Sequence, residues 1–243
     1  NVVAGYYVAG PGEHFLSSSH PWGWLQVGFD DNNWPKAYKG RKGAVKGSVD
    51  YPGRLLVPSP LPQLLREPIR FAVARKVEGV ILPPSFPYKE TAFSVPPNSK
   101  VHIILDQEHL TTGYPVLKFS QGTDATVQIG YAESYYSDRK KRIKGNRHEI
   151  EGKTFVGYTD VVIADGGNNR VYSPLWWRTW RYLDITIETK GEELIIEDIG
   201  AVFSAYPFHK ESEFKNADHP YLEKILEVGW RTAQLCAHET YMD

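Results

Sequence analysis

Short segments in which apolar and polar residues alternate recur along the middle of the chain, and they constrain its fold more than any other feature. The clearest are Val101–Leu105, Ala125–Tyr131, Leu183–Ile187, Leu194–Ile196 and Ala201–Phe203. Residues two apart on a strand share a face, so such segments bury one face and leave the other in water. Between them lie clusters rich in Gly, Asn and Asp, such as Asp165–Asn169, which suit tight turns. The pattern predicts a mainly β protein with an antiparallel, jelly-roll-like β-sandwich over residues 76–210.

The spacing of apolar residues changes near Asp218, where an amphipathic α-helix is expected. Its apolar stripe follows the i, i+3, i+4, i+7 rule and consists of Leu222, Ile225, Leu226, Gly229, Ala233 and Cys236. Asp218 is the expected N-cap, and Pro220 falls in the first turn, where a missing N–H costs nothing. Cys236 is the only cysteine, which excludes an intrachain disulfide and predicts a small buried apolar residue. Such a helix needs another surface to cover its stripe, either the sandwich or a further domain.

The first 75 residues have a different sequence pattern from the rest. Gly23–Pro35 resembles the loop of galactose-binding-like jelly rolls in which a Trp follows an Asp/Asn turn, and the prolines of Pro58–Pro62 interrupt any strand ladder. We therefore predict a partial galactose-binding-like jelly-roll domain over 1–75, the β-sandwich over 76–210, and a linker with the first helix of a further domain over 211–243. The junction between the first two domains is expected between residues 62 and 80.

Composition describes an ordinary soluble globular protein, with 41% hydrophobic residues, 23% charged residues and a net charge of −1. Nucleic acid and anionic membranes favour a strong basic excess, so neither is an expected partner. The basic run Arg139–Lys144 is expected to be a solvated loop tip. No apolar run approaches the ~20 residues that span a bilayer, and no signal peptide leads the chain. The start at Asn1 is typical of a mature or excised segment.

Asp30, Asp31, Asn32 and Asn33 place oxygen ligands in a row, and the alternatives for them are a Ca²⁺ site and an Asx-turn ahead of Trp34. A Ca²⁺ ion takes about six to eight oxygens from a folded loop. Consecutive side chains diverge, and the glycine spacing of a calcium loop is absent, so the Asx-turn is favoured. We predict no metal site and no other cofactor.

Three of the seven tryptophans, Trp176, Trp177 and Trp180, fall within five residues of the segment Pro174–Tyr182 (PLWWRTWRY). An aromatic face can stack on the C–H side of a sugar ring, so the cluster is a candidate sugar platform. If the segment is a strand, Trp176, Trp180 and Tyr182 project to one face and Trp177 to the other. One set would then cap the core and the other would contact a neighbouring domain. Both interpretations, packing and sugar stacking, stay open.

Four segments together resemble landmarks of bacterial α-L-rhamnosidases of the inverting, (α/α)6-barrel kind, which belong to glycoside hydrolase family 78. They are Pro174–Tyr182, Gly113–Ser120 (GYPVLKFS), Gly130–Glu133 (GYAE) and the terminal Glu239–Asp243 (ETYMD). In that family β-sandwich domains precede the catalytic barrel. The resemblance implies that residues 211–243 begin the barrel and that rhamnose-containing glycans or glycosides and the chain's own downstream barrel are the partners.

The resemblance also implies where the chemistry lies. An inverting glycosidase needs a general acid and a general base about 6.5–9.5 Å apart. In the family a Met-Asp pair like Met242-Asp243 opens an acidic motif whose first Asp holds the rhamnose hydroxyls, while the acid and base follow later. Asp243 is therefore the expected substrate-binding residue, and no catalytic residue is expected in this chain. A periplasmic or extracellular location is expected, because enzymes of this kind often act on plant glycans.

Three functions follow from these features. The first is the accessory β-sandwich portion of an α-L-rhamnosidase that releases terminal α-L-rhamnose with inversion. The alternatives are a stand-alone carbohydrate-binding module and a scaffold that only packs on a partner domain.

Overall fold

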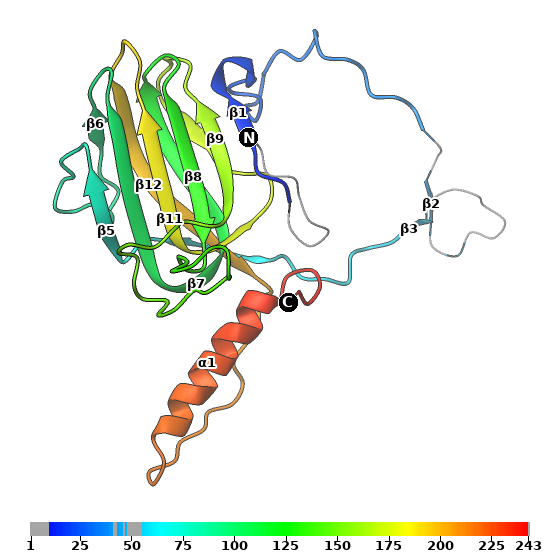
Figure 1. Cartoon of the computed structure of the whole chain (residues 1–243). Coiled ribbons are helices and arrows are strands. Elements are labelled where there is room, and N and C mark those ends of the chain that lie inside the picture. The colour runs from blue at the N-terminus through cyan, green and yellow to red at the C-terminus, as the bar shows by residue number, and fades with distance from the viewer. Residues whose placement is uncertain (1–9, 41–42, 46, 48–54, 243) are drawn as a thin grey trace. The chain divides into compact units, whose positions relative to one another are not determined.

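The computed structural model describes residues 10–40, 43–45, 47 and 55–242. Ten strands form one sheet: β1 (His14–Leu16), β4 (Leu65–Ile69), β5 (Val73–Glu78), β6 (Phe93–Val95), β7 (Lys100–Gln121), β8 (Thr126–Ala132), β9 (Tyr158–Ile163), β10 (Arg170–Tyr172), β11 (Arg178–Glu188) and β12 (Leu194–Ala205). A short 3₁₀ helix, η1, covers Ser17–Ser19, and the helix α1 covers Tyr221–Cys236 (Figure 1). The prediction of a mainly β fold followed by a C-terminal helix is confirmed.

The chain divides into two compact units. The larger joins the segment that ends at Ser19 to the residues from Leu64 onward, and the smaller covers His20–Gln63. In the smaller unit β2 (Ala44–Val45) pairs in parallel with β3 (Leu55–Leu56). In the larger unit β1 and β4, which both fall inside the domain predicted for 1–75, pair with β9 and β12 of the main sheet. The three-domain division at 75 and 210 stays a prediction.

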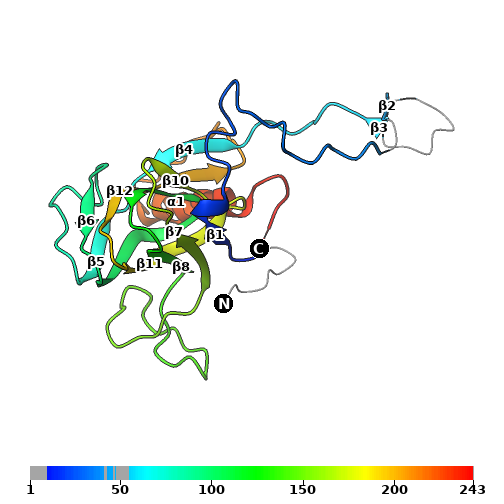
Figure 2. The same ribbon diagram turned by 90° about the horizontal axis from the view of Figure 1, so that it is seen from above.

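The sheet is arranged around one long strand. The first half of β7 pairs with β11 and β5, and β8, β9 and β1 continue outward from β11. The second half of β7 pairs with β12 and β10, and β12 also pairs with β4 and β6. The strand thus passes from one layer into the other, as strands do at the corners of packed sheets. Seen from above, the strands curl around a common interior (Figure 2).

The corner of β7 is formed by polar residues. Glu108 has a φ of 65°, and its backbone N–H donates to the carboxylate of Asp106 at 2.7 Å. Arg181 donates to both oxygens of Asp106, at 3.0 and 3.1 Å, and Arg75 donates at 3.2 Å. Asp106 is buried, so these charge-assisted bonds compensate the loss of its hydration while they fix the bend.

The core lies between the two layers. Its fully buried side chains include Ile103 and Leu105 from β7, Val127 and Ile129 from β8, Leu183, Ile185 and Ile187 from β11, and Leu194 and Ile196 from β12. These residues belong to the alternating segments that predicted the sandwich. The two-residue period of their apolar side chains therefore identified the buried face of each strand correctly. The turn expected at Asp165–Asn169 is also present, with φ values of 76° at Gly166 and 54° at Asn169.

The alternation predicted for the tryptophan segment is wrong at two points. The strand β11 begins only at Arg178, so Trp176 and Trp177 precede it, and the second departure follows Trp180. The register of β11 against β7 shifts between Trp180 and Tyr182. Trp180 packs in the main core, whereas Tyr182 packs on the other side of the sheet in a second cluster with Ile104 and Tyr135. Between the pairs that Trp180 and Tyr182 form with β7, the strand β7 has four residues, 107–110, and β11 has only Arg181, so the regular alternation is broken and the core-facing set passes from Trp180 to Leu183.

The helix α1 begins two residues later than a cap at Asp218 requires. Its N-cap is Pro220, which makes no side-chain capping bond. The side chain of Asn216 instead accepts the backbone N–H groups of Asp218 and His219, at 3.0 and 2.9 Å. Cys236 is half-buried and not fully buried as predicted. In the described part of the chain no helix has the length and apolar character needed to cross a membrane.

Candidate functional site

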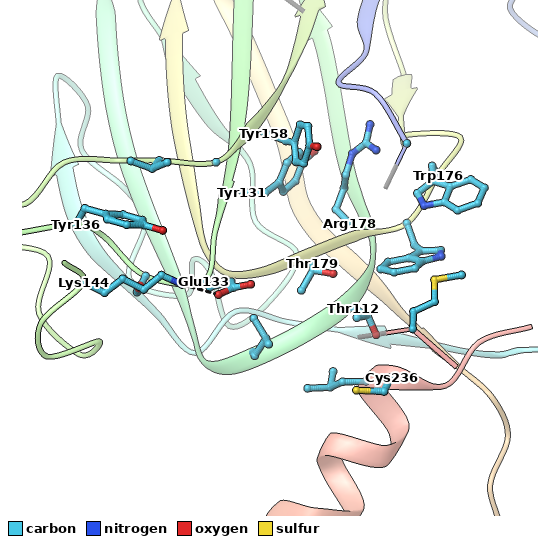
Figure 3. Close-up of a pocket in the computed structure, with 18 residues that line it drawn as sticks. Thr112, Tyr131, Glu133, Tyr136, Lys144, Tyr158, Trp176, Arg178, Thr179 and Cys236 are labelled. Carbon is cyan, nitrogen blue, oxygen red and sulfur yellow. Dashed lines mark hydrogen bonds and ion pairs between the residues drawn. The ribbon is translucent and has the colours of Figure 1, made fainter. Parts of the chain in front are cut away.

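A pocket of about 480 Å³ lies in the larger unit, between the open end of the sheet and the end of α1 (Figure 3). Its wall comes from β7, β8, β11 and the loops beside them, and its floor from residues 235–242. The lining residues are Gly10, Leu110, Thr112, Tyr131, Glu133, Ser134, Tyr136, Lys144, Val156, Gly157, Tyr158, Trp176, Trp177, Arg178, Thr179, Leu235, Cys236 and Met242. A concave surface of this size, apolar with a few polar groups, is typical of small-molecule sites.

The three clustered tryptophans have different positions. Trp176 and Trp177 line the pocket and stack on each other with ring centroids 6.2 Å apart and planes 27° apart. Trp176 is 43% exposed and Trp177 is half-buried. Trp180 is fully buried in the core, so a ligand in the pocket does not reach it. Of the predicted sugar-stacking residues, the structure therefore brings two to one surface and places the third beneath it.

The C-terminal segment contacts the tryptophan pair through His238. His238 stacks on Trp177 at 4.2 Å with planes 9° apart. Its backbone is fixed by a bond from its N–H to the carbonyl oxygen of Thr240 at 3.1 Å, and the N–H of Met242 donates to the carbonyl of Cys236 at 2.7 Å. Burial lowers the pKa of His238, although a contact with the Ser204 backbone opposes the shift. The imidazole is therefore neutral near pH 7 and acts here as a flat packing surface.

Arg178 and Asp160 form a buried ion pair behind the pocket. The guanidinium donates to both carboxylate oxygens of Asp160, at 3.0 and 2.8 Å. Tyr131 and the backbone of Glu13 donate to the same carboxylate at 2.6 and 2.7 Å. Burial lowers the pKa of Arg178, but the pairing with Asp160 more than compensates and the net shift is upward. Burial and the nearby Asp160 raise the pKa of Tyr131, so its hydroxyl stays protonated as a donor.

The far end of the pocket is polar. Lys144 donates to Glu133 at 2.8 Å, and its ammonium lies 5.6 Å from the centre of the Tyr136 ring. Figure 3 shows this group on the opposite side of the pocket from Trp176. Ser134 lies beside the pair and is buried, and its hydroxyl lacks a hydrogen-bond partner among the described residues. Sequence reasoning missed this polar end because it assigned Lys144 to a solvated basic run, which holds only for the exposed Arg139–Ile143.

The sequence offered two further candidates. Asp243, the predicted substrate-binding residue, falls outside the described residues. In the smaller unit, Asp30 accepts the backbone N–H of Asn32 at 3.0 Å and its side-chain amide at 2.7 Å, which is the Asx-turn that the sequence favoured. Within the described ranges, no group of three or more His, Cys, Asp or Glu residues could hold a metal ion.

The fold and pocket define a β-sandwich with a tryptophan-walled cavity beside its C-terminal helix. No protein-family model matches the sequence, and no curated sequence matches it significantly. Among solved structures, the chain is similar to a family 78 rhamnosidase of Bacillus sp. GL1 (20% identity, TM-score 0.48, 60% of this chain and 14% of that one). It is also similar to a rhamnosidase from Klebsiella oxytoca with rhamnose bound (18% identity, TM-score 0.49, 75% and 37%).

A third similarity is to the CBM32 domains of ZmpB from Clostridium perfringens, at 11% identity and a TM-score of 0.39, over 56% of this chain and 35% of that one. The chain thus spans less than two fifths of the length of each of these proteins. All three TM-scores lie below 0.5.

Proposed function

We propose that the chain is the accessory β-sandwich portion of an α-L-rhamnosidase and that it supports a downstream catalytic barrel without cleaving sugar itself. The motif segments that resemble the rhamnosidases support this proposal by their placement. Gly113 on β7 pairs with Arg178 on β11, and Ala132 on β8 pairs with Tyr182 on β11. Three segments that are far apart in sequence thus meet at one end of the sheet, beside the C-terminal segment that carries the fourth.

The observation that carries the supporting role is the uncovered stripe of α1. None of its residues is buried. Ile225, Leu226 and Val228 are 58%, 51% and 60% exposed. Arg231 donates to the carbonyl of Leu110 at 2.8 Å, which ties the last turns to the sheet and leaves the first turns projecting (Figure 1). A helix with an apolar stripe gains its stability from packing, so these residues suit a contact with further helices.

The pocket lacks the carboxylate pair that inverting hydrolysis needs. Glu133 is the only acidic residue among those that line it, and it is already paired with Lys144. Hydrolysis with inversion uses two carboxyl groups on opposite faces of the sugar. We infer that the acid and base lie in the downstream barrel. Asp243 belongs to the same proposal as the residue that holds the rhamnose hydroxyls.

Hydrolysis of 4-nitrophenyl α-L-rhamnopyranoside tests the non-catalytic role. The purified chain should release nitrophenol no faster than buffer does. If it turned the substrate over and Glu133→Gln abolished the rate, the chemistry would lie in this pocket and the assignment would be wrong.

The parent protein can be tested independently. A reading frame that continues past Asp243 into several hundred helical residues with further acidic clusters would support the accessory role, whereas a stop codon at that point would leave a binding module or a scaffold. In the full-length protein, Asp243→Asn should lower kcat/KM by at least ~100-fold at an unchanged melting temperature, because a charged hydrogen bond that tightens in the transition state contributes about 3 kcal/mol. Unchanged turnover would remove Asp243 from the site.

A further inference from the structure

We propose that the tryptophan-walled pocket is itself a binding site for an uncharged pyranoside, with the sugar ring on Trp176 and its hydroxyl groups toward Glu133 and Ser134. This inference goes beyond the accessory role, because it requires neither the barrel nor hydrolysis. It concerns the described residues of the larger unit alone.

The first support is a preformed aromatic surface. Trp176 is 43% exposed and stacks on Trp177, and Trp177 in turn stacks on His238. Gly10 lies so close that a Cβ built there would stand 2.8 Å from Trp176 Cγ, so the absent side chain lets the backbone press against the indole. These contacts hold the partly exposed indole of Trp176 in place. A fixed π face with a negative quadrupole attracts the positively polarised C–H groups of a sugar ring at little entropic cost.

The second support is the charge of the lining. The three charged residues that line the pocket are Glu133, Lys144 and Arg178. Glu133 and Lys144 neutralise each other at 2.8 Å. Arg178 is neutralised by Asp160 through two bonds. A carboxylate oxygen of Glu13 also lies 3.6 Å from the Arg178 guanidinium. The lining therefore offers hydrogen bonding without an uncompensated positive charge, which suits a neutral sugar better than a uronic acid or a phosphate.

The third support is unused polar capacity at the end opposite Trp176. The hydroxyl of Ser134 is buried without a partner among the described residues, which is a costly state that a ligand or water hydroxyl would relieve. Glu133 accepts Lys144 through Oε2, and a carboxylate has room for further hydrogen bonds. Aromatic contact at one end and acceptors at the other match a ring with an apolar face and a polar rim.

Titration of the isotopically labelled chain with methyl α-L-rhamnopyranoside, followed by ¹H–¹⁵N spectra of the indole N–H groups, tests this site. We expect saturable shifts that include the Trp176 indole. Trp176→Ala should weaken binding by about tenfold or more, and Trp176→Phe, which keeps an aromatic face, should weaken it less. Trp34→Ala is the matched control, because Trp34 is 47% exposed, belongs to the smaller unit and does not line the pocket. It should bind as the unaltered chain does.

Charge selectivity provides a second readout. Sodium glucuronate should not bind to the unaltered chain. Glu133→Gln leaves the Lys144 ammonium uncompensated, so this variant should gain affinity for glucuronate while it loses affinity for the neutral glycoside.

Several outcomes would overturn the proposal: no saturable shift with the neutral glycoside, an equal effect of Trp34→Ala and Trp176→Ala, or tighter binding of glucuronate by the unaltered chain. Absence of binding would refute this site and leave the accessory role standing. Conversely, binding by a chain whose reading frame stops at Asp243 would sustain this site and refute the accessory role.

Discussion

Replacement of Trp180 by alanine separates core packing from ligand binding in the tryptophan cluster. Trp180 is fully buried among the main core residues, with its ring centroid 6.3 Å from that of Tyr131. A buried Trp removes roughly 150–250 Å² from water. At ~25 cal/mol per Å² this corresponds to about 4–6 kcal/mol. Partial collapse of the surroundings usually brings the loss into the range of ~3–5 kcal/mol, which we expect for Trp180→Ala.

The free energy of unfolding can be measured by urea denaturation followed by far-UV circular dichroism. Trp180→Phe should cost less than Trp180→Ala, because it keeps an apolar ring and because the Trp180 Nε1 proton has no hydrogen-bond partner to lose among the described residues. Trp176→Ala should cost less than Trp180→Ala, because 43% of Trp176 is already exposed to water in the folded protein. If Trp180→Ala cost less than about 1 kcal/mol, or if Trp176→Ala cost as much, the division into a core and a pocket-facing pair would be wrong.

Three further predictions concern stability. Arg178→Met leaves the buried Asp160 carboxylate without its cation, so the free energy of unfolding measured by urea denaturation should fall by ~3–5 kcal/mol. Lys100→Met removes an exposed ion pair and should lower it by less than about 1 kcal/mol. Gly113→Ala should lower the melting temperature, because its Cβ would stand 2.3 Å from a backbone carbonyl oxygen of β12, while Gly191→Ala, with open space around it, should not. The contribution of His238 to the free energy of unfolding should be constant above pH 6.5. It should decline as the pH falls below that value, until the lowered pKa of His238 in the folded state is passed. His238→Phe keeps a ring and does not titrate, so it should reduce this decline, and an unchanged decline would show that other groups cause it.

The sequence predicted the elements better than their partners. Alternation located the segments that became β7, β8, β11 and β12, because burial of one face imposes a period of two. The change of period located α1 in the same way. Local reasoning failed where a distant residue decides the outcome. The face of Tyr182 depends on the register shift against β7, and the N-terminal end of α1 depends on the side chain of Asn216.

Only the tryptophan side of the pocket could be predicted from the sequence. The tryptophan pair was recognisable from its density in Pro174–Tyr182. The partner at the other end, Lys144, stands in a run of exposed charges, and its pairing with Glu133 requires the loop between β8 and β9 to fold back on itself. The floor comes from residues about 60 positions after the tryptophans. The topology of the fold brings these segments together, and neither the composition nor the residue spacing of any one segment predicts that topology.

The passage of β7 through both layers has a consequence for how the protein folds. Its first half is completed by β11 and its second half by β12, which follow it by roughly 60–90 residues. Neither layer can therefore be lost without unpairing a strand of the other, so the sandwich should exchange its backbone amide protons as one cooperative unit. During synthesis the first half of β7 can pair with β11 once residue 188 has emerged, whereas the second half lacks β12 until residue 205 has emerged. A truncation between residues 188 and 205 would leave the second half of β7 without β12 and expose that strand edge to aggregation.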